Sequence, residues 1–121
     1  MRRTIVATPR NSLILVMDRT IGVIPDAMGG GLVAATSSCV AVGTLSEYDG
    51  ETSISLSDEG KALGFDSTPV FDGMLETPSK VLSICTVLND VLLELGVPSE
   101  KTRVRIWAND VSEPDNIVVV V

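Results

Sequence analysis

The chain has 121 residues, of which 45% are hydrophobic, so length and composition predict a single soluble domain over residues 1–121 with its own core. The net charge is −7 and the chain contains no histidine. An acidic chain is unsuited to non-specific nucleic-acid binding, and the lack of imidazole excludes Ser-His and Cys-His catalysis and most catalytic zinc sites.

The acidic residues are concentrated in the middle of the chain. Residues 1–19 carry four arginines and one aspartate, whereas residues 20–79 carry one lysine and nine acids. This distribution predicts an acidic surface that would suit a basic protein partner. The N-terminus lacks the apolar run of a secretion signal, and no stretch approaches the roughly 20 apolar residues of a transmembrane helix. We therefore expect a cytoplasmic protein that binds neither membranes nor nucleic acid.

The N-terminal third predicts two strands followed by an irregular segment. The strands are expected at residues 2–7 and 13–18, separated by a turn. Residues 25–36 are the least strand-like stretch, since Gly29, Gly30 and Gly31 indicate a long loop. A short helix through residues 32–36 is an alternative for the end of this segment.

The next part of the chain predicts further short strands. One is expected at residues 38–43, and the Asp49-Gly50 pair after it is typical of a hairpin turn. Thr52, Ile54 and Leu56 then alternate with serines, which predicts a strand with an apolar face and a small polar face. Residues 58–73 are expected to be mostly loop, with one short strand at residues 70–71. Another short strand is expected at residues 74–77, before Pro78.

Residues 79–95 allow two interpretations. Two strands, at residues 80–88 and 91–95, would be joined by a turn at Asn89-Asp90. One helix from Ser79 to Leu95 would gather the leucines and valines on one stripe about as well. We favour two strands, because the Asn-Asp pair and the β-branched residues before it are poor in a helix interior.

The C-terminal stretch predicts a hairpin. Residues 101–108 alternate, so that aliphatic side chains face the core while Arg103, Arg105 and Trp107 face solvent. The partner run, residues 117–121, is apolar throughout, which indicates a strand covered on both faces. Exposed at a sheet edge, such a strand would pair with another chain, so we expect a second sheet or self-association to cover it.

These elements predict an all-β fold: one antiparallel β-sandwich, or a small barrel, of about eight short strands. Only four residues are aromatic, so the core must be aliphatic. Cys39 and Cys85 lie in apolar strand patterns and are expected to be buried, reduced thiols without a disulfide.

Few residues suggest a site. The best candidate binding surface is Arg103, Arg105 and Trp107, because an indole beside guanidinium groups is typical of interface hot spots. The alternative is that acids on a neighbouring strand neutralise these arginines. The glycine run is read as a surface loop, and the acidic turns near residues 47–51 and 109–116 as solvated turns rather than calcium sites. We expect no cofactor and no metal.

The C-terminal half of the chain resembles a known group of proteins in the order of its strands and turns. Within residues 73–121, the segments GMLETPSKVLSI, LELGVPSEKTRVRIWAND and EPDNIVVVV place a strand, a proline-bearing turn, RVRIWA, an acidic turn and a final apolar strand in that order. This order resembles the closing strands of small bacterial β-sandwich proteins of the competence-J/immunity-like group. The resemblance implies a sandwich and transfers no active-site residue.

The function predicted from these observations is a non-catalytic protein-interaction module, of an immunity or regulatory type, that uses an acidic surface. The alternative is a small-molecule-binding protein or a minor enzyme with a pocket between the sheets near Gly29 to Gly31. Enzymatic activity is disfavoured, because only carboxylates, lysines, one tyrosine and hydroxyls remain as catalytic groups.

Overall fold

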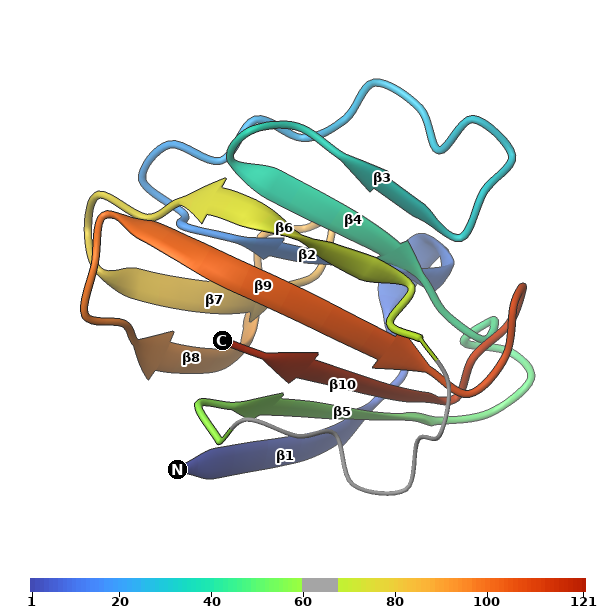
Figure 1. Ribbon diagram of the computed structural model, residues 1–121. Helices are drawn as coiled ribbons and strands as arrows, with labels where there is room; N and C mark the ends of the chain where they lie inside the picture. Colours follow the sequence, from blue (N-terminus) through green and yellow to red (C-terminus); the bar gives the residue numbers. More distant parts are fainter. Residues whose placement is uncertain (60–67) are drawn as a thin grey trace.

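The computed structural model describes residues 1–59 and 68–121, which form ten strands in two facing five-stranded sheets (Figure 1). Sheet A contains, in spatial order, β1 (Arg2–Ala7), β5 (Thr52–Ser57), β10 (Asn116–Val120), β9 (Lys101–Ala108) and β6 (Phe71–Glu76). Sheet B contains β3 (Val33–Ala35), β4 (Cys39–Gly43), β2 (Leu13–Met17), β7 (Val81–Cys85) and β8 (Val91–Gly96). The predicted β-sandwich is confirmed, with more strands than the eight or so expected. No helix of the described residues is long and apolar enough to cross a membrane.

The core lies between the two sheets and is aliphatic. Ile14 and Val16 of β2 point inward from sheet B, and Ile54 and Leu56 of β5 point inward from sheet A. All four are completely buried. Burial of one such side chain contributes roughly 1.5–3 kcal/mol, so these inward faces hold the sheets together.

The C-terminal strand β10 lies in the middle of sheet A. It pairs parallel with β5 and antiparallel with β9, so the predicted hairpin is confirmed. Ile117 and Val119 join the core, and Val118 and Val120 on the opposite face are also buried. The expected burial on both faces is therefore confirmed. The edge argument for self-association is wrong, because both edges of β10 are already paired within the chain.

The parallel β5–β10 pair departs from a purely antiparallel sandwich. Parallel neighbours cannot be joined by a tight hairpin, and β6 to β9 intervene here between the two strands. This pairing is a property of the whole topology, and no local pattern in either strand indicates it.

Two local predictions before β5 are wrong. The alternative of a short helix at residues 32–36 fails, because Val33–Ala35 pair with β4 as strand β3. The Asp49-Gly50 pair closes no hairpin, since its loop carries the chain from β4 in sheet B to β5 in sheet A. Pairing with distant strands decides both cases: β2 and β3 occupy the two edges of β4, so β5 cannot pair there.

Residues 79–95 form two strands, as the favoured interpretation predicts. β7 and β8 pair antiparallel, with Leu82 opposite Leu95 and Ile84 opposite Leu93. Asn89 in the connecting turn has a φ of 65°, a conformation that asparagine tolerates better than most residues. The register shifts next to Ile84, so that β8 contains a bulge.

The outer face of sheet B carries a second apolar cluster. It consists of buried side chains from β2, β4 and β7, namely Leu15, Met17, Cys39, Ala41 and Cys85. Met28, from the connection between β2 and β3, packs against this cluster. Gly29 and Gly30 follow it with φ values of 65° and 79°, which glycine adopts readily. The glycine run therefore belongs to a segment that covers sheet B, and the prediction of buried, unpaired thiols is confirmed.

Candidate functional site

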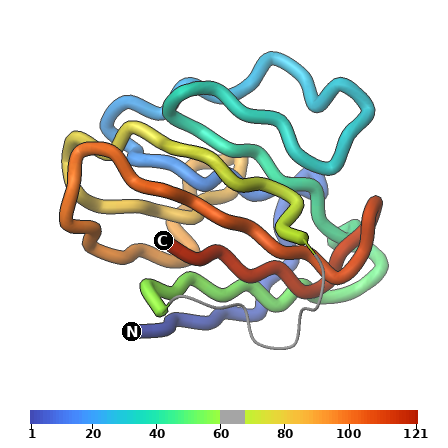
Figure 2. The backbone as a smooth tube through the Cα atoms, viewed as in Figure 1, coloured from blue at the N-terminus to red at the C-terminus, as the bar shows by residue number. Residues whose placement is uncertain are grey.

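Two acidic loops meet at the end of the sandwich opposite the termini (Figure 2). One joins β4 to β5 and the other joins β9 to β10. The backbone N–H of Leu45 donates to the carbonyl of Pro114 at 2.9 Å, and that of Ser53 donates to the carbonyl of Asp115 at 2.8 Å. We call residues 45–51 and 109–115 together the acidic end.

The β9–β10 loop is held by its own side chains. The Oδ1 atom of Asn109 accepts hydrogen bonds from the backbone N–H groups of Asp115 and Asn116, each at 3.1 Å. Asp110 accepts from the backbone N–H of Glu113 at 2.9 Å and from that of Ser112 at 3.1 Å. These bonds hold the pKa of Asp110 below its usual value, with the bond from Glu113 as the largest cause. The loop is therefore ordered before any partner arrives, and its carboxylate is charged at neutral pH.

The β4–β5 loop is a compact turn. The backbone N–H of Asp49 donates to the carbonyl of Ser46 at 2.9 Å, and that of Tyr48 donates to the Ser46 hydroxyl at 3.3 Å. Gly50 has a φ of 152°, where a side chain would be strained. This turn carries Tyr48 at its tip, with acids on either side of it in the sequence.

The acidic end combines carboxylates with exposed apolar side chains. Tyr48 is 91% exposed and Val111, on the neighbouring loop, is 86% exposed. Around them the two loops carry six acidic residues, Glu47, Asp49, Glu51, Asp110, Glu113 and Asp115. Arg10 lies on the adjoining turn, whose Ser12 carbonyl accepts a hydrogen bond from Thr44. Tyrosine is enriched at binding hot spots, and carboxylates around it suit a basic partner.

The surface predicted from the sequence lies elsewhere, on the outer face of β9. The Arg103 guanidinium donates to both carboxylate oxygens of Asp72 on β6, from Nε at 3.0 Å and from a terminal nitrogen at 2.8 Å. This guanidinium holds the pKa of Asp72 below its usual value. The Arg105 guanidinium lies 5.6 Å from the centre of the Trp107 ring. The three predicted residues therefore share one face, and a cross-strand acid neutralises Arg103, as the alternative interpretation holds.

The alternative of a pocket near Gly29 to Gly31 stays a prediction. Three open clefts of roughly 480, 360 and 320 Å³ are lined by residues from other parts of the chain. In the described part of the chain, no group of three or more His, Cys, Asp or Glu side chains is placed to hold a metal ion. Tyr48 and Val111 at the acidic end are exposed rather than enclosed, which suits contact with a protein surface.

The fold belongs to the class of small β-sandwiches with two five-stranded sheets, of which sheet A is mixed and sheet B is antiparallel. It is similar to ComJ from Bacillus subtilis, an inhibitor of the DNA-degrading activity of NucA, with a TM-score of 0.68 and 10% sequence identity over 98% of this chain and 92% of ComJ. It is also similar to the protein described as crocagin biosynthetic gene J, with a TM-score of 0.51 and 13% identity over 98% of this chain and 94% of that one. The resemblance to the competence-J group predicted from the C-terminal half is confirmed at the level of the fold. No protein-family model and no curated protein matches the sequence.

Sequence reasoning missed the acidic end because it treated the two loops as separate solvated turns. More than 50 residues separate Tyr48 from Val111 in the chain, and only the sheet order makes their two loops neighbours. The available local signal was the single tyrosine of the chain, which stands among three acids beside a turn-forming Asp-Gly pair.

Proposed function

We propose that this protein is a non-catalytic, inhibitor-type binding partner that engages a basic protein through the acidic end. The observation that carries the proposal is the pair of hydrogen-bonded loops that present Tyr48 and Val111 among six carboxylates. An ordered loop loses little entropy on binding, so such a surface is suited to tight association.

The fold similarity supports this direction. ComJ inhibits a DNA-degrading activity. Enzymes that act on DNA contact phosphates with lysine and arginine side chains, so their surfaces attract acidic proteins. The net charge of −7 on this chain suits a partner of that kind.

The proposal is tested by capture of partners from cells of the native host with purified variants. Tyr48→Ala, Val111→Ala and the double variant Glu51→Gln/Glu113→Gln alter the acidic end. We expect the Tyr48→Ala variant to bind the captured protein at least about tenfold more weakly, as is typical of a hot-spot residue. Added salt is expected to weaken the wild-type complex, because exposed charges are screened. Isothermal titration with the purified partner measures both effects, and an activity assay of that partner shows whether it is inhibited.

Two control variants separate this surface from others. Asp26→Asn/Glu100→Gln removes the same two charges from exposed positions outside the acidic end and is expected to leave binding unchanged. Arg103→Gln tests the surface predicted from the sequence, which stays a second candidate for partner contact together with Arg105 and Trp107. If Arg103→Gln abolishes capture while the acidic-end variants bind normally, the proposed site is wrong and the partner is an acidic one.

A further inference from the structure

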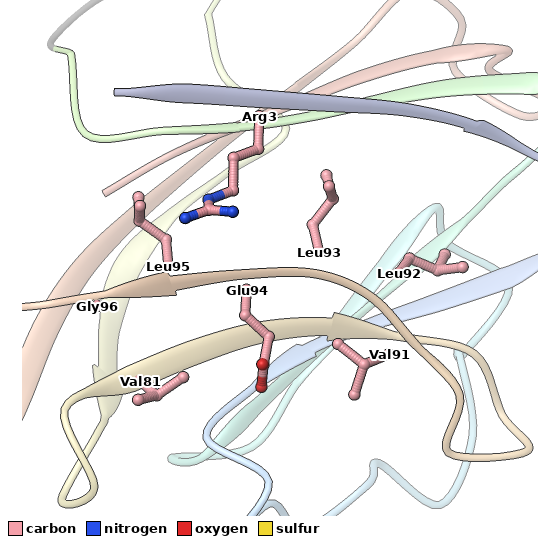
Figure 3. Close-up of a pocket in the computed structure, with 8 residues that line it drawn as sticks. All are labelled: Arg3, Val81, Val91, Leu92, Leu93, Glu94, Leu95 and Gly96. Atoms are coloured by element: carbon pink, nitrogen blue, oxygen red, sulfur yellow. The ribbon is translucent and has the colours of Figure 1, made fainter.

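An open groove of about 480 Å³ runs along one edge of strand β8 (Figure 3). Six consecutive residues of β8, from Val91 to Gly96, line it, together with Val81 of β7 and Arg3 of β1. Leu93 and Leu95 point from β8 toward β1, on the side of the core, and Glu94 points to the opposite side (Figure 3). A groove that touches both faces of one strand is centred on the backbone edge of that strand.

None of the strands in the described part of the chain pairs with the backbone edge of β8 that lines this groove. β8 ends the order of sheet B, and it pairs with β7 alone among the described strands. An unpaired strand edge offers N–H and C=O groups to any extended segment that approaches it. Addition of a strand to such an edge is a common mode of peptide recognition.

Arg3 has an unusual place beside this edge. It lies opposite Leu56, a completely buried core residue, so its side chain starts on the inner face of the edge strand β1. Figure 3 shows it extending from β1 toward β8. It makes no hydrogen bond or ion pair with any residue that the structure describes, whereas the outward-facing Arg2 contacts the Ser55 hydroxyl at 3.4 Å. The groove therefore contains a guanidinium that pairs with no anionic side chain among residues 1–59 and 68–121.

We propose that this groove binds an extended peptide strand, which adds to the free edge of β8 and turns a carboxylate side chain toward Arg3. On such a strand, alternate side chains face opposite sides. Those on the inner side would meet Arg3, Leu93 and Leu95, which suits a carboxylate flanked by aliphatic residues. Those on the outer side would meet Glu94, which accepts a hydrogen bond from the Ser83 hydroxyl at 2.9 Å and suits a basic residue.

A second copy of this chain fits the groove less well. Antiparallel pairing of two β8 edges about a twofold axis keeps the inner faces together and the outer faces together. Such a pair would bring the two Arg3 side chains to one side of the seam and the two Glu94 side chains to the other. Like charges on both sides oppose that dimer, whereas a separate peptide can carry the complementary charges.

The test uses a synthetic probe, the capped peptide acetyl-Lys-Val-Thr-Glu-Thr-Val-Lys-amide, whose alternation matches the two faces of the groove. The peptide is titrated into ¹⁵N-labelled protein, and the amide signals of the protein are followed by NMR. We expect the amide signals of β8 to shift and their exchange with solvent to slow. In Arg3→Gln protein the affinity is expected to fall about fivefold, the size typical of a partly exposed charge-assisted hydrogen bond.

Two controls isolate the contact with Arg3. A peptide with glutamine in place of the glutamate is expected to bind wild-type and Arg3→Gln protein equally. Its higher positive charge favours association with this acidic chain, so a preference for the glutamate peptide cannot arise from net charge. Arg2→Gln removes the same charge from the opposite face of β1. We expect it to leave the affinities for the glutamate peptide and for the glutamine peptide unchanged.

Several results would overturn the proposal. One is shifts confined to the other sheet edges, β3 or β6, and another is an Arg3→Gln penalty that is equal for both peptides. A third is a lack of binding by either peptide, in which case Arg3 acts only as an inward-pointing charge that protects a strand edge from pairing. The acidic end lies outside this groove, so failure here leaves the proposed function untouched.

Discussion

At the residue scale, burial sets the chemistry of the two thiols. Cys39 is completely buried on β4, and this burial raises the pKa of its thiol from an ordinary value near 9 to about 11. Burial also raises the pKa of Cys85, while nearby Arg19 acts against that shift. Both thiols therefore remain protonated in the folded protein at neutral pH, and neither resembles a nucleophile, which needs a lowered pKa.

The raised pKa of Cys39 predicts a loss of stability at alkaline pH. Between about pH 9 and 11 the unfolded chain ionises this thiol and the folded protein does not, so a rise in pH favours unfolding in that window. Urea unfolding of wild-type and Cys39→Ala protein, compared across the window, measures the effect. We expect the free energy of unfolding to fall more steeply in the wild type. Parallel pH profiles for the two proteins would show that Cys39 does not contribute.

At the element scale, β10 is the central strand of sheet A. It separates β5 from β9 in sheet A, and its side chains are buried on both faces. Because β5 and β9 are far apart in the chain, β10 connects two strands that no local turn would bring together. A substitution that destabilises β10 should therefore lower the stability of the whole of sheet A.

Ile117→Ala tests this role of β10. Removal of a completely buried isoleucine side chain leaves a cavity, and we expect a loss of about 3 kcal/mol in the free energy of unfolding. Val6→Ala on the edge strand β1 is the matched control. Val6 is 56% exposed, so its truncation should change stability by less than about 0.5 kcal/mol. Chemical denaturation of both variants measures the difference, and similar losses would contradict the central role of β10.

At the scale of the whole molecule, charge and topology determine which partners are suitable. The net charge of −7 opposes association with polyanions, and the acidic end gathers much of that charge at one end of the sandwich. Self-association, which the sequence predicts, would require a surface other than the edges of β10. That prediction stays open to light-scattering measurement.

The charge distribution also predicts a negative result with nucleic acid. We expect no shift of double-stranded DNA in a gel mobility assay at low salt, where electrostatic binding is strongest. A basic protein of similar size serves as the positive control. Salt-sensitive binding of DNA by the wild-type chain would contradict the proposal that the partner is a basic protein.

The local pattern of the chain was sufficient for most strands. Alternation at Thr52, Ile54 and Leu56 predicted β5, and the two-faced run that carries Arg103, Arg105 and Trp107 predicted β9. Period-two alternation reports which side chains are buried, and burial against a second sheet is what stabilises these strands. The sequence by itself therefore determined the all-β class, the aliphatic core, the buried thiols and the overall excess of negative charge.

Only the tertiary structure decided which strands became neighbours. β3 is a strand because β4 offers it an edge, and the Asp49-Gly50 loop crosses between sheets because that edge is already taken. The same long-range pairing places Tyr48 beside the loop of Val111 and leaves Arg3 at the free edge of β8. Hydrogen bonds between strands far apart in the chain depend on the packing of the whole sandwich, and for that reason no local pattern of residues could reveal either site.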